Sequence, residues 1–476
     1  MTHSSLRPRP PAASQTAPGT PFTAALTRSH LSAPQLVRAV NVKLEATGLP
    51  ALHPTTAYNW CTGSMPRSPH VRSLVALTLS EATGTTVTAD ELWGPSTQPR
   101  PVLSAADELL GPRRLPDVLN TAAHWSAETT VHADTQPATP TTLFTAVWDA
   151  THQPPSPACA MRHSAPRVEP AMINLLEEHL SSLRHLDDQT GGGPLAQRRV
   201  RIALSEVILL LRTSSHTPDV RTRLLHNAAG LSQLGGWMAF DSNLTAAAQR
   251  YQLLALRLAR AADDTDTVSN ILGMLAYQYA ATGHPQEALR YATAAVEHAA
   301  RSLPLVRARA LGRLATAHAA AGDIDRFRRT HEECRALITR RTPGDPSCLY
   351  YFTDEQLAAE TGHALVELAT THHRQTRALL SEASRLLTPH VRQGGVTGYR
   401  RSAVLHGIHL ARAHLLARDT EATAAVLTHV AAGLAGVQSP RCRALLRALR
   451  TRAGRRLRTA GHPHALEAVD RALSST

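Results

Sequence analysis

The stretch LAYQYAATGHPQEALRYATAA, from Leu275 to Ala295, decides how the second half of this chain folds. Two Ala-rich segments flank Gly283, and glycine is the residue that most readily ends a helix in a left-handed conformation. Comparable turns recur about every forty residues. Their markers are Asp241, Gly283, Gly322 and Gly362, and the pattern returns at Asp419 and Gly461.

Repeated helical hairpins predict an α-solenoid, because each pair of helices buries its apolar face only against its neighbours. The expected helix pairs lie at 226–261, 267–300, 304–340, 349–388, 400–435 and 440–473. A solenoid presents a long surface to a partner and seldom a deep catalytic pocket. We therefore expect the second half to bind rather than to catalyse.

The composition agrees with an all-α protein. Apolar residues make up 43% of the 476 residues and aromatic residues only 4%, so burial must rely on Ala, Leu and Val in closely packed helices. The formal net charge is +13, and Lys43 is the only lysine among 50 basic residues. A basic balance favours nucleic acid or an acidic partner.

Composition also divides the chain. The parts are a Pro-rich disordered arm over 1–22, a small helical domain over 23–94, a Pro/Thr-rich linker over 95–168, and the repeats over 169–476. Within the linker we expect short helices around 115–127 and 142–150. No apolar run is long enough for a signal peptide or a membrane span, so the expected location is the cytoplasm, with no membrane contact.

The segment 31–93 carries the clearest candidate site. Ser32 is a good N-cap for a first helix, and a second helix of nine residues is expected to begin at Pro54 and to end before Gly63. At 100° per residue this helix has two faces. Its apolar face holds Ala57, Trp60 and Cys61, its polar face holds Thr55, Asn59 and Thr62, and Thr56 and Tyr58 lie at the edges.

The run YNWCTG from Tyr58 to Gly63, followed by Pro66-Arg67, resembles the helix-turn-helix of Cro/CI-type (XRE-like) repressors. In that fold the second helix of the motif lies in the DNA major groove. The resemblance implies contact with double-stranded DNA by Thr55, Thr56, Tyr58, Asn59, Thr62 and Arg67.

The segment departs from that family in two places. Ala33 stands where the family has Gln, and residues 42–52 lengthen the connection between the helices. Over residues 23–93 the cations only just outnumber the acids, which predicts modest affinity for one copy. Dimerisation, or Arg7 and Arg9 of the arm, would then be needed for tight binding.

The repeats resemble tetratricopeptide (TPR) units, although their period exceeds the usual 34 residues. The residues at the spacing of that signature are Leu275, Ala276, Tyr279, Gly283, Ala288 and Ala295. With the run Trp237–Asp241, the order of parts resembles actinobacterial regulators linked to sporulation and antibiotic production. The resemblance implies a transcriptional regulator whose TPR-like domain binds a protein or peptide partner or a second copy of the chain, as a homodimer.

Other sites have little support. The Gly191–Gly193 triplet is not followed by Lys-Ser/Thr, so it predicts a hinge and not a P-loop. The pairs His372-His373 and His406/His409 lack further ligands for a metal. We expect no enzyme activity, no cofactor and no metal site.

Two alternatives remain open. The chain could be a helical-repeat scaffold that binds no DNA, its helix-turn-helix serving only as structure. The Arg-rich helices after residue 440 could be a solvated cap of the solenoid or a basic patch that contacts phosphates.

Overall fold

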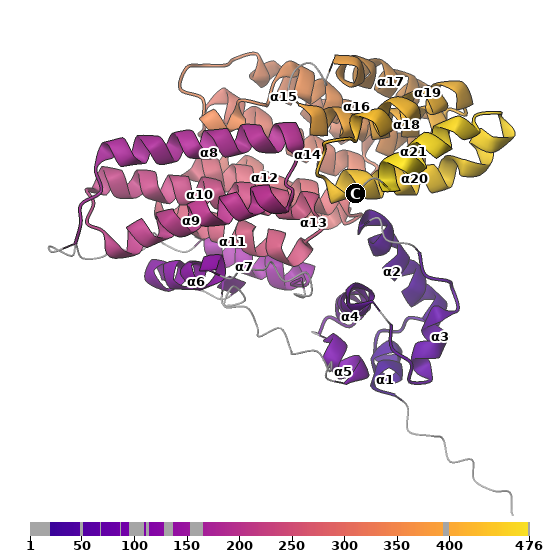
Figure 1. The fold of residues 1–476 in the computed structure, drawn as a ribbon, viewed down its shortest axis with the longest axis horizontal. Helices are drawn as coiled ribbons and strands as arrows, with labels where there is room; N and C mark the ends of the chain where they lie inside the picture. Colours follow the sequence, from indigo (N-terminus) through magenta and orange to yellow (C-terminus); the bar gives the residue numbers. More distant parts are fainter. Residues whose placement is uncertain are drawn as a thin grey trace, which may run out of the picture. The chain divides into compact units, whose positions relative to one another are not determined.

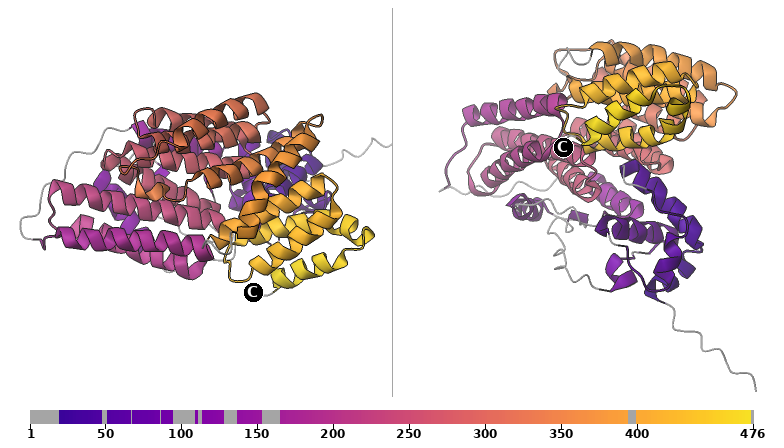
Figure 2. Two further views of the ribbon diagram at one scale, coloured as in Figure 1. Left: turned by 90° about the horizontal axis from the view of Figure 1, so that it is seen from above. Right: turned by 45° about the vertical axis from the view of Figure 1, so that its right-hand side comes forward.

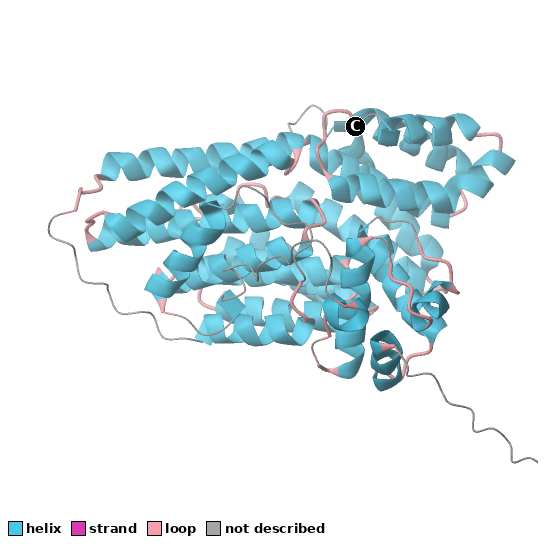
Figure 3. Ribbon diagram, turned by 60° about the horizontal axis from the view of Figure 1, so that its bottom comes forward, coloured by secondary structure: helices cyan, strands magenta, loops and turns pink. Residues whose placement is uncertain are grey.

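The computed structural model describes residues 20–47, 51–66, 68–85, 87–94, 109–110, 114–127, 137–152, 165–393 and 399–474. These residues form twenty-one α-helices and no β-strand, and Figure 3 shows helices joined by loops. A single isolated bridge joins Arg167 and Ser215. The prediction of an all-α protein is confirmed.

The chain divides into two compact units. The first contains residues 1–41 and 52–100, and the second contains 42–51 and 101–476. The helices up to residue 93 are α1 (Pro21–Arg28), α2 (Ala33–Thr47), α3 (Thr56–Cys61), α4 (Pro69–Thr83) and α5 (Ala89–Trp93).

Aromatic side chains hold the first unit together. Phe22 of α1 stacks on Trp93 of α5 with ring centroids 5.6 Å apart, and Trp60 of α3 meets both rings edge to face. Phe22 and Trp60 are almost fully buried. Such aromatic contacts add to the stabilisation from burial alone. The Trp60 side chain therefore anchors α3 to the core of the first unit.

The helix α1 begins at Pro21, two residues before the expected start of the helical domain at residue 23. Pro21 occupies the first turn, and the Thr20 hydroxyl accepts a hydrogen bond from the Thr23 amide, which is an N-cap followed by a first-turn proline. The expected cap at Ser32 is present too. The Gln35 backbone amide donates to the Ser32 hydroxyl, and the Ser32 amide donates to Oε1 of the Gln35 side chain, which together form a capping box.

The second unit is a stack of antiparallel helix pairs, seen side by side in Figure 1. An N-terminal pair, α8 (Pro170–Thr190) and α9 (Pro194–Thr213), precedes the repeats. The repeats are α10 (Pro218–Asp241) with α11 (Thr245–Ala261), α12 (Thr265–Ala281) with α13 (Pro285–His298), α14 (Pro304–Ala320) with α15 (Ile324–Ile338), α16 (Asp354–Thr371) with α17 (Thr376–Gln393), α18 (Arg400–Leu416) with α19 (Thr420–Gly433), and α20 (Pro440–Thr459) with α21 (Pro463–Ser474). The six predicted pairs are confirmed as a solenoid-like repeat fold.

The turns follow the predicted chemistry in most repeats. Gly283, Gly322 and Gly461 have φ between +75° and +81°, where glycine carries no steric penalty. Asp419 caps α19 by accepting a hydrogen bond from the Ala422 amide. The prediction for Gly362 is wrong, because this residue lies in the middle of α16.

Gly362 is small for a packing reason. A Cβ at this position would lie 2.6 Å from Cγ of Leu387 in α17. The residue therefore allows two helices of one repeat to approach closely, as glycine does where no side chain fits.

Two helices of the predicted linker belong to the solenoid core. They are α6 (Leu115–Ala127) and α7 (Pro140–His152), close to their expected positions. Leu119 and Leu143 are buried in the same apolar cluster as α9 and α11, and Trp125 lies 4.2 Å from Tyr251, centroid to centroid. This part of the chain thus adds a layer to the solenoid.

The solenoid curls so tightly that its last repeats meet its first helices, as the two views of Figure 2 show. The Gln438 amide donates to the Thr190 carbonyl at 2.6 Å, and α18 contacts α8. The turn Gly191–Gly193, which we expected as a hinge, is tightly packed, since a Cβ on Gly192 would lie 2.6 Å from Met238 Cβ.

Among the helices that the structure describes, none combines the length and the apolar character needed to cross a bilayer.

Candidate functional site

The helix α3 carries most of the residues for which we expected DNA contact. It spans Thr56–Cys61, six residues, so the expectation of nine residues starting at Pro54 is wrong. His53 and Thr55 form a turn before it, in which the Thr56 amide donates to the His53 carbonyl. Ala57 and Trp60 are buried as predicted, and Gly63 follows with φ of +99°.

The predicted polar face of α3 points outward. Thr55, Tyr58, Asn59 and Thr62 are exposed, and Thr56 is half-buried. Tyr58 is 53% exposed, a large fraction for an aromatic residue. Arg67, the sixth residue that we expected to contact DNA, lies outside the described residues.

These side chains differ in how free they are. The Thr55 hydroxyl contacts Nδ1 of His53 at 2.8 Å, and the Thr62 hydroxyl donates to the Asn59 carbonyl at 2.8 Å. The side-chain amide of Asn59 and the hydroxyl of Tyr58 make no hydrogen bond within the described part of the chain. Because an amide can donate and accept in one plane, Asn59 has the chemistry to read an adenine edge.

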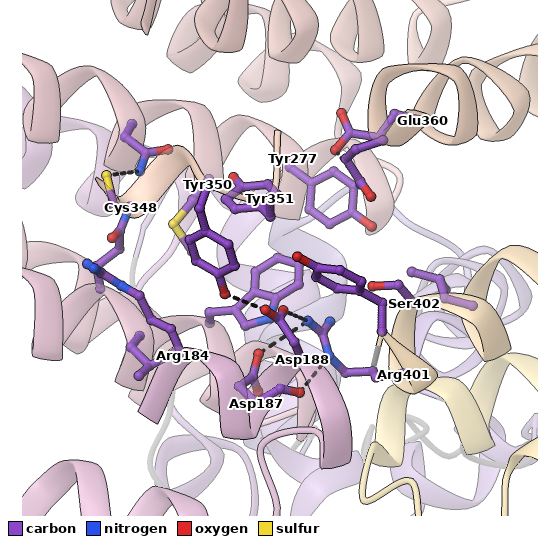
Figure 4. A pocket seen from close by; sticks show the side chains of 18 of the residues that line it. Arg184, Asp187, Asp188, Tyr277, Cys348, Tyr350, Tyr351, Glu360, Arg401 and Ser402 are labelled. Atoms are coloured by element: carbon purple, nitrogen blue, oxygen red, sulfur yellow. Dashed lines mark hydrogen bonds and ion pairs between the residues drawn. The ribbon is translucent and has the colours of Figure 1, made fainter. Parts of the chain in front are cut away.

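A second candidate site is a pocket inside the solenoid, with a volume of about 150 Å³. Residues of α8, α10, α12, α14, α16 and α18 line it, together with the segment between α15 and α16 that contains the 3-10 turn η2 (Ser347–Leu349). Its aromatic lining is Trp237, Tyr277, Tyr350, Tyr351 and Tyr399. Figure 4 shows tyrosines lying between Glu360 and the group Asp187, Asp188 and Arg401.

An ion-pair group closes one end of the pocket. Arg401 of α18 donates to Oδ2 of Asp187 at 3.2 Å, lies 3.7 Å from Asp188, and stacks 5.3 Å from the ring centroid of Trp237. Burial raises the pKa of Asp187 to about 7, although Arg401 opposes the shift. Tyr350 donates a hydrogen bond to Asp188, so the segment after α15 is tied to α8.

The other end is built around Glu360. Arg309 holds both carboxylate oxygens, with Nη2 to Oε2 at 2.9 Å, and Gln356 donates to Oε1 at 3.0 Å. Burial would raise the pKa of Glu360, but Arg309 and Arg313 outweigh it and lower the pKa to about 2. Glu360 therefore remains charged and its oxygens are already occupied.

No protein-family model and no curated protein matches this sequence.

Four histidines form a group at the pocket, and two of them, His363 and His406, line it. Nδ1 of His406 lies 3.1 Å from Nε2 of His363, His363 stacks on His409 at 3.8 Å, and His390 meets His406 edge to face. Burial lowers the pKa of His406 to about 3 and the pKa of His363 and His409 well below the ordinary value. In the described residues no group of three metal-ligating side chains is arranged to hold a metal ion.

The Arg-rich C-terminal helices use several of their cations internally. Arg441 is buried, lies 4.7 Å from the ring centroid of Phe240, and donates to the Tyr277 hydroxyl at 2.8 Å. Arg450 pairs with Asp470, with Nε to Oδ1 at 2.8 Å. These residues serve the packing of the solenoid.

Sequence reasoning missed the pocket. Its lining comes from helices more than 200 residues apart, as in the pair Asp187 and Arg401. The available signal was compositional: most of the tyrosines and a tryptophan lie in the repeats of a chain that is otherwise poor in aromatic residues.

Proposed function

We propose that this protein is a sequence-specific DNA-binding transcriptional regulator whose α3 enters the major groove. The observation that supports this most directly is the outward face of α3, where the Asn59 amide and the Tyr58 hydroxyl have no partner within the described residues. Ala57 and Trp60 on the opposite face of α3 are buried and hold the helix in place. The Tyr58 and Asn59 side chains therefore project from a rigid helix.

The second part of the proposal concerns the solenoid, which would bind a protein or peptide partner or a second copy of the chain. Binding of such a partner would change how many α3 helices reach their half-sites on DNA. The family resemblance suggests genes of development or antibiotic production as targets.

A specific observation favours a second candidate function, that of a scaffold without DNA binding. The helix α3 is only six residues long, and the Thr55 and Thr62 hydroxyls already have internal partners. A scaffold does not need side chains on α3 that are free to contact DNA bases.

A gel-shift titration of the full chain separates the two. A DNA reader retains a sequence selected from a random pool, and its affinity falls steeply as salt rises because released counterions drive binding. The double substitution Thr55→Ala with Asn59→Ala should abolish sequence preference. Thr27→Ala, which changes an exposed threonine on α1, serves as the control and should bind like the unmodified protein. No retention even at low salt would support the scaffold and overturn the proposal.

A further inference from the structure

The pocket in the solenoid contains a buried cation with unused donors. Arg313 of α14 is 6% exposed, and its guanidinium lies 4.6 Å from the ring centroid of Tyr277. Its nearest carboxylate oxygen, on Glu360, is 3.8 Å away, too far for a hydrogen bond. Within the described residues Arg313 makes no hydrogen bond, so its N–H groups remain available to an acceptor in the pocket.

Gln233 of α10 is a second buried polar group that lines the pocket without a partner. It is 8% exposed, and its amide makes no hydrogen bond to the described residues. Arg313 and Gln233 therefore both present hydrogen-bonding atoms to the pocket that are available to a ligand.

The charges around Arg313 favour an anion. Two guanidiniums, Arg309 and Arg313, face one carboxylate, Glu360, whose oxygens are held by Arg309 and Gln356. Burial lowers the pKa of Arg313, and the charge of Arg309 lowers it further. An arginine nevertheless stays protonated in proteins, so this end of the pocket carries one uncompensated positive charge.

The opposite end of the pocket has only a small excess of negative charge, so it does not favour a cation as strongly as the Arg313 end favours an anion. Arg401 lies between Asp187 and Asp188. Burial raises the pKa of Asp187 to about 7, so near neutral pH this carboxyl is partly protonated. The three side chains together then carry less than one full negative charge. Arg184, half-buried in the pocket wall, adds another positive charge. Three guanidiniums and three carboxylates line the pocket, so the preference for an anion belongs to the end that holds Arg313.

Size and lining restrict the body of the ligand. A cavity of about 150 Å³ is the size that holds one benzene ring. Tyrosine and tryptophan rings lie between the charged ends, as Figure 4 shows for Tyr277, Tyr350 and Tyr351. Such walls favour an aromatic ring, which can stack or meet them edge to face.

We infer that the solenoid pocket binds a carboxylate attached to a single aromatic ring, with the carboxylate on Arg313 and the ring among the tyrosines. A free aromatic acid and an aromatic residue at the C-terminus of a peptide share this chemistry. The inference does not depend on DNA binding, because every lining residue belongs to the second unit.

Isothermal titration of the full chain without DNA tests the inference. Phenylacetate represents the free acid and N-acetylphenylalanine the peptide terminus, each compared with its neutral amide. At least one acid should bind at a single saturable site, about tenfold or more tighter than its amide, because a buried guanidinium gains most from a charged acceptor. Whichever acid binds more tightly identifies the source of the ligand.

Variants locate the carboxylate. Arg313→Met removes the charge and keeps an apolar side chain beside Tyr277, so affinity for the acid should fall about tenfold or more while the amide is unaffected. Arg450→Met, which removes an arginine from an ion pair in α20 outside the pocket lining, should leave binding unchanged.

Three results would overturn the inference: no saturable binding of either acid, equal affinity for acid and amide, or unchanged affinity in a folded Arg313→Met protein. If that variant does not fold, the comparison of acid with amide on the unmodified protein decides. Loss of DNA retention in the gel shift would leave all these outcomes untouched, so the two proposals fail separately.

Discussion

Replacing Gly362 with alanine tests how closely the helices of a repeat pack. The new Cβ would lie 2.6 Å from Cγ and 2.9 Å from Cδ2 of Leu387, which is well inside van der Waals contact. Gly454→Ala is the matched control, because Gly454 also lies inside a helix, α20, and the nearest atom to its Cβ is 3.6 Å away.

Both substitutions gain stability from helix propensity, but only Gly362→Ala also creates a steric clash. Replacing a helix-interior glycine with alanine stabilises by about 0.8–1 kcal/mol through helix propensity. Overpacking a tight contact costs about 1–3 kcal/mol. Gly454→Ala should therefore raise the free energy of unfolding by about 1 kcal/mol. Gly362→Ala should leave it unchanged or lower it by up to about 2 kcal/mol.

Urea unfolding of the full chain, followed by far-UV circular dichroism, measures both changes. Midpoints are compared together with slopes, because repeat proteins do not always unfold in one step. The difference between the two variants isolates the steric term, since the propensity term cancels. Equal stabilisation by both substitutions would refute the close packing of α16 on α17.

Further substitutions test other parts of the structure. Trp60→Ala empties the aromatic core of the first unit and should destabilise that unit by about 3–5 kcal/mol, seen as faster proteolysis before residue 94. Arg309→Met leaves Glu360 buried with a poorer partner and should cost about 3–5 kcal/mol in urea unfolding. Burial lowers the pKa of His406 to about 3, so its contribution to stability is present above about pH 6.5 and is lost as the pH falls towards 3. His406→Gln should therefore show a smaller drop in Tm between pH 7 and pH 5 than the unmodified protein, and an identical drop would contradict this role.

Local patterns were enough to predict the helix pairs, because apolar periodicity and turn residues act over a few positions. The prediction for Gly362 was wrong because the sequence alone does not distinguish a glycine that ends a helix from one that allows a second helix to pack closely. The packing against Leu387 is visible only in the structure. The helix α1 was missed, although Thr20 and Pro21 form a recognisable N-terminal signal.

The pocket could not be predicted from such patterns. It exists because the solenoid curls until α18 meets α8, and that curvature sums small rotations between successive repeats. The outward face of α3 was predictable, since helical periodicity separates Ala57 and Trp60 from Asn59.

The most direct test of the proposed gene control is a map of where the protein sits on the genome in its native cells. We expect discrete peaks that share one sequence motif and that disappear in the Thr55→Ala/Asn59→Ala protein at equal abundance. An absence of peaks, or peaks that the double variant keeps, would contradict DNA reading by α3.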